Sequence, residues 1–120
     1  MPGFKPLPAD AMTWTKNVLG AEVTRLYTNG AVLTIVHGNK DDLVPDHGYT
    51  HGCVTYVVSG RLEIDGHELR AGDAGSYQPG SGYFSVRFLE DSVYVVARTA
   101  ADELTIPDLG ERSAAHLDSG

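Results

Sequence analysis

The segment DHGYTHGCVTYVVSG, residues 46–60, gathers several side chains that can bind metals or move protons. His47 and His51 carry imidazole nitrogens, Tyr49 carries a phenol and Cys53 a thiol. Two histidines with a cysteine suit Zn or Cu, and two histidines with an oxygen ligand suit Fe(II). The same imidazole and phenol groups can act as general acids and bases without an ion. The residue types alone leave both kinds of site open.

The spacing of these residues limits what they can do together. If the segment is one regular strand, residues 47, 49, 51 and 53 project to the same side and form one wall of a pocket. On such a strand His47 and His51 stand about 13 Å apart, so a shared metal ion requires a bend, which Gly48 would allow. We favour hydrogen-bonded pocket histidines and keep a metal site on His47 and His51 as the alternative. The apolar flank of Cys53 predicts a protonated thiol that lines the pocket.

A second segment, SYQPGSGYFSVRFLED, places Tyr83 and Arg87 on one face of a strand. We expect this face, and not that of Phe84, Val86 and Phe88, to point inward. An inward Arg87 needs an anionic partner, either a carboxylate or enolate on a ligand or the side chain of Glu63.

Composition restricts the class of protein. The chain has 120 residues, enough for one domain, and a formal net charge of −7, which argues against a nucleic-acid partner. A single cysteine excludes an intramolecular disulfide and predicts a reducing, cytoplasmic location. The sequence shows no apolar leader and no stretch long enough to span a membrane, so we expect no membrane partner.

Turn signals divide the chain into short strands. The runs 23–28 and 31–37 flank Asn29-Gly30, which predicts a hairpin. The polar run 39–46 is expected to be a loop. Eight or nine short strands without a long amphipathic helix are typical of a sandwich or small barrel. We expect a proline-rich arm over residues 1–15 anchored by Trp14, a body over residues 16–106, and a polar tail over residues 107–120.

The middle of the chain resembles the cupin superfamily. VTYVVSGRLEIDG, ending its first strand at Gly60, is similar to the end of the first cupin motif, and LRAGDAGSYQPGSGY, with Gly72 and Gly80, is similar to the second. The details loosely resemble cupins of the anti-sigma and acetylacetone-dioxygenase type. The resemblance implies an all-β, single-domain cupin barrel, which is a jelly-roll-like double-stranded β-helix, and a homodimer.

The family's metal-ligand positions are largely changed in this sequence. Alignment on Gly60 and Gly72 puts His47, Tyr49, Cys53 and Tyr83 at the four positions, and only His47 keeps the usual residue. The resemblance therefore leaves the cofactor unknown: a divalent metal (Fe, Zn, Ni or Mn) is possible, and a metal-free site is favoured.

We expect a small-molecule enzyme with its active site inside the barrel. Acid/base groups would be His47, His51, Tyr49 and Tyr83, with Cys53 and Arg87 contacting the substrate. The reaction would be an isomerisation, cyclisation or elimination, or a metal-dependent oxygenation, of a small enolisable or aromatic substrate. The alternative is a non-catalytic cupin that binds a small ligand or regulates, and that has lost its metal.

Overall fold

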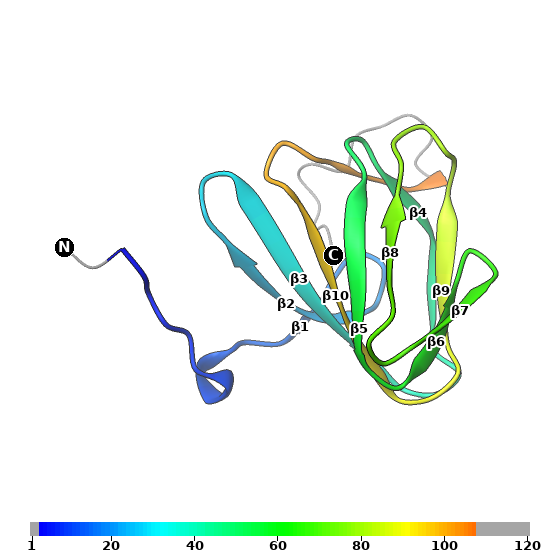
Figure 1. Cartoon of the computed structure of the whole chain (residues 1–120), viewed down its shortest axis with the longest axis horizontal. Helices are drawn as coiled ribbons and strands as arrows, with labels where there is room; N and C mark the ends of the chain where they lie inside the picture. The colour runs from blue at the N-terminus through cyan, green and yellow to red at the C-terminus, as the bar shows by residue number, and fades with distance from the viewer. Residues whose placement is uncertain (1–2, 108–120) are drawn as a thin grey trace.

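Two antiparallel sheets make up most of the part of the chain that the computed structural model describes, residues 3–107 (Figure 1). One sheet has six strands in the order β1-β2-β3-β10-β5-β8, and the other has five in the order β11-β4-β9-β6-β7. The strands are β1 Thr15–Lys16, β2 Glu22–Tyr27, β3 Ala31–Gly38, β4 Leu43–Tyr49, β5 Cys53–Ser59, β6 Arg61–Ile64, β7 His67–Arg70, β8 Ala74–Tyr77, β9 Phe84–Phe88, β10 Ser92–Thr99 and β11 Leu104–Thr105. The predicted all-β fold is confirmed, as two facing sheets rather than one closed hydrogen-bonded barrel. Within residues 3–107, no helix is long and apolar enough to cross a membrane.

Residues 3–14 form an arm that extends away from the sheets (Figure 1). It contains one turn of 3-10 helix, η1 Ala9–Ala11, and joins the six-stranded sheet where β1 pairs with β2. Trp14 is exposed, so the expectation that it anchors the arm is wrong. The predicted polar tail, residues 107–120, lies outside the described residues apart from Pro107.

The hairpin predicted around Asn29-Gly30 is confirmed. β2 and β3 pair from Glu22 opposite His37 to Tyr27 opposite Val32. The backbone N–H of Thr28 donates to the carbonyl of Ala31 and closes the turn. The Asn29-Gly30 pair thus forms the turn that joins β2 and β3, as such pairs commonly do in hairpins.

The loop predicted over residues 39–46 is partly wrong, because β4 already begins at Leu43. A turn covers residues 39–42, where the Asp42 carboxylate accepts from the backbone N–H of Asn39 at 2.8 Å. Pro45 is tolerated in the strand because the pairing of β4 with β9 shifts register between Val44 and His47. Such a bulge needs no ladder hydrogen bond from the proline, and it lets Val44 and His47 both point inward.

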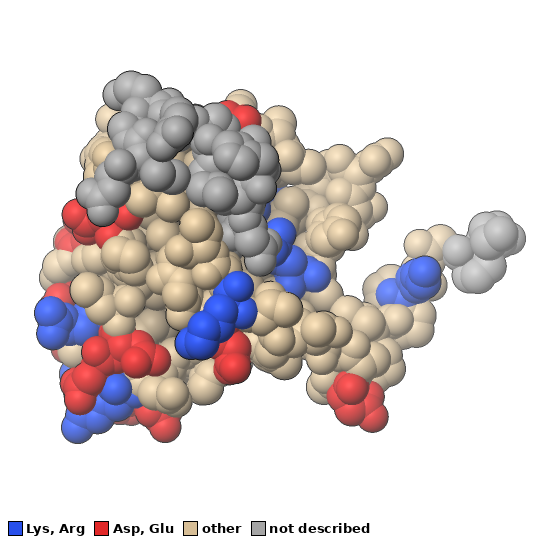
Figure 2. Space-filling view, turned by 180° about the vertical axis from the view of Figure 1, so that it is seen from behind, with Lys and Arg blue, Asp and Glu red and all other residues tan. Residues whose placement is uncertain are grey.

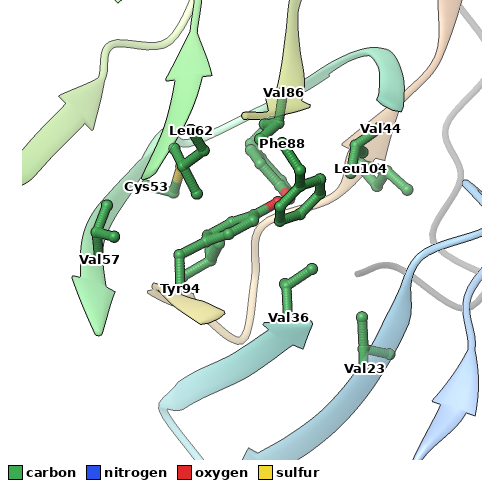
Figure 3. Close-up of a cluster of buried hydrophobic side chains, with 12 residues drawn as sticks. Val23, Val36, Val44, Cys53, Val57, Leu62, Val86, Phe88, Tyr94 and Leu104 are labelled. Carbon is green, nitrogen blue, oxygen red and sulfur yellow. The ribbon is translucent and has the colours of Figure 1, made fainter. Parts of the chain in front are cut away.

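The core lies between the two sheets and takes side chains from both (Figure 3). At its centre the rings of Phe88 on β9 and Tyr94 on β10 lie 6.0 Å apart between centroids. Gly38, at the end of β3, lies directly against Phe88: a Cβ at this position would be 2.4 Å from the Phe88 ring. The core therefore requires glycine here.

The turn between β5 and β6 explains one glycine of the sequence motif. Gly60 has φ +85°, and a Cβ there would lie 2.2 Å from the Ser92 hydroxyl oxygen. That oxygen accepts from the backbone N–H of Arg61 at 2.9 Å. Gly60 is thus fixed both by backbone conformation and by the approach of β10.

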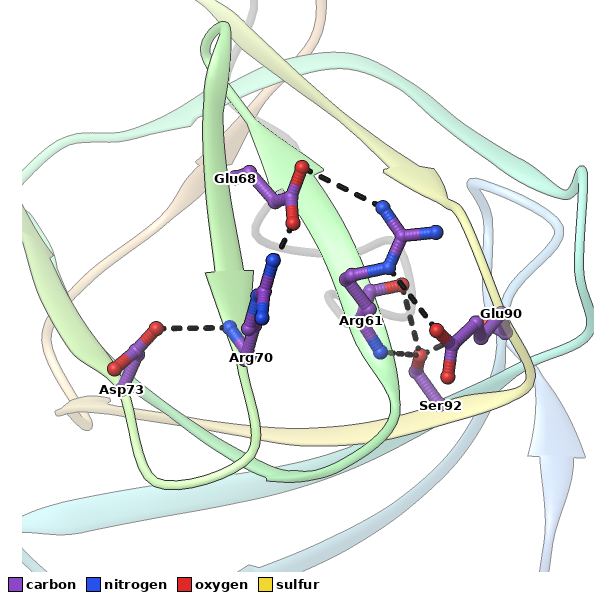
Figure 4. Close-up of polar contacts among 6 residues, drawn as sticks. All are labelled: Arg61, Glu68, Arg70, Asp73, Glu90 and Ser92. Carbon is purple, nitrogen blue, oxygen red and sulfur yellow. Dashed lines mark hydrogen bonds and ion pairs between the residues drawn. The ribbon is translucent and has the colours of Figure 1, made fainter.

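The outward face of β6 and β7 is charged. Arg61 pairs with Glu90 at 3.0 Å and with Glu68 at 3.4 Å, and Glu68 also pairs with Arg70 at 3.3 Å (Figure 4). In Figure 2 acidic and basic side chains lie next to each other at the left of the view, on the side where β6, β7 and β9 lie. These exposed pairs contribute little to stability, but they keep this face solvated.

Replacing Gly38 with Ala is expected to destabilise the protein by about 1–3 kcal/mol, because the methyl group would push the Phe88 ring out of its packing. Urea denaturation measures the change. Gly75→Ala is the matched control, since Gly75 is also in a strand but has open space at its Cβ, and should change the free energy of unfolding by less than about 1 kcal/mol. Equal effects of the two substitutions would contradict this account of the core.

Candidate functional site

The histidine-rich segment is not one strand. β4 ends at Tyr49 and β5 begins at Cys53, with a turn over residues 50–52 between them. His47, Tyr49 and Cys53 are buried in the interior, but of the three only Cys53 lines the cavity described below. His51 lies on the turn with an exposed side chain, so its predicted place on the same wall is wrong. The regular alternation that would put it there stops at the turn.

A buried carboxylate holds this turn. Asp102 Oδ1 accepts from the Thr50 hydroxyl at 3.0 Å and from the backbone N–H of His51 at 2.5 Å. The Thr50 hydroxyl oxygen in turn accepts from the backbone N–H of Glu103 at 2.9 Å. Because β11 pairs with β4 directly after Asp102, the end of the sheet and the turn are fixed together.

His47 is a buried, neutral imidazole. Its Nδ1 lies 2.7 Å from the carbonyl oxygen of Pro45, which can only accept, so Nδ1 carries the proton and Nε2 does not. Burial lowers the pKa of His47, and this outweighs the hydrogen bond to Pro45 and the nearby charge of Asp46. The ring lies 4.4 Å from that of Phe84 and 5.6 Å from that of Tyr49, between centroids.

Tyr49 is buried among aromatic rings. Its ring is near those of Phe84 and Tyr77, at centroid distances of 6.4 and 6.5 Å, and the Arg98 guanidinium lies 5.7 Å from its centroid. Burial strongly raises the pKa of the phenol, so the hydroxyl keeps its proton at neutral pH. Tyr49 therefore has the character of a packed aromatic residue with a neutral hydroxyl.

Cys53 also stays protonated. Burial, and then the negative charge of Asp102, raises the pKa of the thiol to about 11. A thiol with this pKa is a weak donor and a poor nucleophile at neutral pH. The sequence-based prediction of a protonated, pocket-lining cysteine agrees with this environment.

The inward face of β9 is the opposite of the predicted one. Phe84, Val86 and Phe88 point into the interior, and Tyr83 and Arg87 are exposed. Tyr83 precedes the strand, and the Tyr77 hydroxyl donates to the carbonyl of Gly82 just before it. Arg87 lies at the position directly opposite Glu63 of β6, outside the core. The acid/base role predicted for Tyr83 and the substrate contact predicted for Arg87 thus lose their geometric basis.

A cavity of about 510 Å³ opens between β5 and β8 on one side and β6 and β7 on the other. Its apolar lining comes from Ile64, Leu69, Tyr77 and Phe84. Its polar lining comes from Cys53, Thr55, Asp65, His67, Glu68, Asp73 and Ser76. Phe84 lines the cavity and covers His47, which does not line it.

Three residues of this region were not singled out by sequence reasoning. Asp102 holds the turn, Arg98 lies over Tyr49 and donates to the carbonyl of Asp102 at 3.3 Å, and His67 lines the cavity. Arg98 could have been found, since it follows the inward residues Tyr94 and Val96 at intervals of two along β10. Asp102 and His67 lie in or next to a turn, where alternation gives no signal.

No protein-family model and no curated protein matches this sequence. Among solved structures, an RmlC-like cupin from Shewanella frigidimarina matches with a TM-score of 0.69 at 17% identity, covering 82% of this chain and 91% of that one. The chain has the cupin fold. The resemblance drawn from Gly60, Gly72 and Gly80 is thereby confirmed.

Other cupin structures of the types expected from the sequence are also similar. An acetylacetone dioxygenase from Acinetobacter johnsonii matches with a TM-score of 0.72 at 12% identity, covering 94% of this chain and 85% of that one. The complex of SigE with the anti-sigma ChrR from Rhodobacter sphaeroides matches with a TM-score of 0.65 at 20% identity, covering 75% of this chain and 51% of that one. The cupin fold thus accommodates an enzyme in one neighbour and an anti-sigma in another.

The interior of this protein does not suit a divalent metal ion. Of the side chains at the family's ligand positions, His47 offers one imidazole nitrogen, while Tyr49 and Cys53 hold their protons. The inward position opposite His47 on β9 is Phe84, which has no donor atom. Metal sites need several deprotonated or neutral donor atoms that converge. In the described part of the chain, no three His, Cys, Asp or Glu side chains gather in this way, and His51 is outside the interior.

Replacing Asp102 with Ala is expected to lower the free energy of unfolding by about 1–3 kcal/mol, because the Thr50 hydroxyl and the His51 N–H, both partly buried, lose their acceptor. Urea denaturation measures the loss. Asp102→Asn keeps one carbonyl oxygen as an acceptor, so its free energy of unfolding should fall clearly less than that of the alanine variant. An alanine variant as stable as the wild type would show that the turn does not depend on this carboxylate.

Stability should fall as the pH drops below about 6.5, because the unfolded chain then protonates His47 while the folded protein, with its lowered pKa, does not. The loss continues down to the folded pKa, at up to about 1.4 kcal/mol per pH unit. Urea denaturation at a series of pH values measures it. His47→Gln, which cannot titrate, should lose less stability over the same range, and parallel curves for the two proteins would rule out His47 as the cause.

Proposed function

We propose that this protein is a cupin that binds a small molecule in the cavity between β5, β8, β6 and β7 without using a metal ion. Phe84 carries the proposal, because it occupies the inward position opposite His47 and turns an apolar ring toward the cavity. A side chain without a donor atom at that point favours contact with a ligand over coordination of an ion. A concave, partly apolar cavity of this size is typical of small-molecule sites.

The lining indicates the kind of ligand. The rings of Tyr77 and Phe84, 4.9 Å apart between centroids, offer an apolar surface together with Ile64 and Leu69. Cys53 and Thr55 add neutral polar groups. This combination suits a ligand with a ring or branched aliphatic part and one or two hydroxyl or carbonyl groups.

Acid/base catalysis by the residues expected from the sequence has less support. A general acid or base must reach the substrate and change its protonation near the working pH. His47 is covered by Phe84, the Cys53 thiol has a pKa of about 11, and Tyr83 lies outside the interior. The cupin fold itself does not decide between an enzyme and a binding protein. The non-catalytic alternative is therefore the one that the side chains favour.

The proposal is tested by titrating the ¹⁵N-labelled protein with benzyl alcohol, a small probe with a ring and a hydroxyl. Saturable shifts are expected for backbone amides that line the cavity, such as those of Cys53, Ser76 and Tyr77, with a dissociation constant of about 1 mM. Gly75→Phe should abolish them, since the new ring would fill the cavity from β8.

Gly75→Ala is the matched control and should leave binding of benzyl alcohol intact. Binding should also survive dialysis against EDTA, because no ion is needed. Shifts outside the cavity, or shifts that persist in Gly75→Phe, would overturn the cavity assignment. Stoichiometric metal in the purified protein that is lost in His47→Ala would overturn the metal-free site.

A further inference from the structure

The formal charges around the cavity between β5, β8, β6 and β7 have one sign. Its lining includes the carboxylates of Asp65, Glu68 and Asp73 and, among the described residues, no Lys or Arg side chain. The outward face of β6 and β7, by contrast, mixes acidic and basic side chains in ion pairs (Figure 4). A molecule that enters the cavity therefore meets negative charge only.

Two of these carboxylates, Asp65 and Asp73, lie at what is here called the cavity margin. Asp65 is in the turn between β6 and β7, and Asp73 directly precedes β8, so the two come from opposite walls. Both residues are exposed, whereas Cys53 and Phe84 of the same lining are buried and half-buried. The cavity is thus acidic at its margin and neutral in its deeper part.

Neighbouring cations offset the three carboxylates to different extents. Glu68 pairs with Arg61 at 3.4 Å and with Arg70 at 3.3 Å, so its charge is largely balanced outside the cavity (Figure 4). Asp73 accepts only from a neutral donor, the backbone N–H of Arg70 at 2.9 Å (Figure 4). Among the described residues, neither Asp65 nor Asp73 is in an ion pair. These two carboxylates supply the negative charge at the margin.

The apolar lining also tolerates a cation. The rings of Tyr77 and Phe84 lie 4.9 Å apart between centroids and both line the cavity. The face of an aromatic ring is electron-rich and attracts an ammonium group. A positive charge is therefore not opposed by the rings or by the margin.

We propose that the ligand of this cavity carries a cationic amine beside its ring or branched aliphatic part, and that Asp65 and Asp73 select it over anionic ligands. The inference rests on the proposed function, because it takes the cavity to be a ligand site. The apolar part of the ligand lies against Tyr77 and Phe84, and its ammonium group lies toward the cavity margin. A ligand with a carboxylate or phosphate group would meet like charges there and bind poorly.

Three probes of similar shape test this selection on the full chain: benzylamine, benzyl alcohol and benzoate, which are cationic, neutral and anionic at pH 7. Each is titrated into ¹⁵N-labelled protein at low ionic strength, with the amides of Cys53, Ser76 and Tyr77 as reporters. Benzylamine is expected to bind about 3–10-fold more tightly than benzyl alcohol, and benzoate at least about threefold more weakly. Salt should reduce both differences, because the carboxylates are exposed.

The double variant Asp65→Asn, Asp73→Asn removes both charges at the margin. Asparagine keeps a side-chain oxygen that can accept from the Arg70 N–H, and it tolerates the φ of +51° at residue 65. This variant should bind benzylamine and benzyl alcohol with affinities within about twofold of each other. Its affinity for benzyl alcohol should equal that of the wild type.

The matched control is the double variant Asp10→Asn, Asp41→Asn, which removes the same charge at two residues outside the cavity lining. It should keep the preference for benzylamine. Equal affinities of the wild type for the three probes would overturn the selection and leave the proposed function standing. So would a benzylamine preference that persists without the charges of Asp65 and Asp73, or one that the control also loses. No saturable binding of any of the three probes in the cavity would overturn the proposed function, and this inference with it.

Discussion

The narrow space between the two sheets is the constraint on which the site depends. Packed sheets stand about 10 Å apart, so each inward side chain must fit against those from the facing sheet. On β9 the inward positions hold Phe84, Val86 and Phe88, and Phe84 packs on His47. Because the Phe84 ring occupies this position, His47 is shielded from solvent and neutral. The apolar lining of the cavity then comes in part from Phe84 and Tyr77. The chemistry of the interior thus follows from the residue that β9 places opposite His47.

Much of the fold could be predicted because its signals are local. The Asn29-Gly30 turn specifies a hairpin, and Gly60 marks a turn that β10 approaches closely. The predicted loop over residues 39–46 failed at Pro45, because a bulge accommodates the proline and lets the strand start earlier. Bulges depend on the partner strand, which a single sequence does not display.

The site was predicted less well because face assignment depends on where turns interrupt the strands and on the register of each strand against its partner. A turn after Tyr49 removes His51 from the interior, and on β9 the inward set is Phe84, Val86 and Phe88, one residue out of register with the predicted set. An error of one residue reverses every side chain of a strand. His47 and Cys53 do lie inward, since both are on the same side of their own strands as the core residues.

Asp102 accepts hydrogen bonds from Thr50 and His51, which lie 52 and 51 positions earlier in the chain. A contact across such a distance must close a long loop before it stabilises anything, and folding that relies on such contacts is slow. During synthesis the segment from His47 to Cys53 emerges long before Asp102 does. The turn between β4 and β5 can therefore gain these hydrogen bonds only once Asp102 has been synthesised.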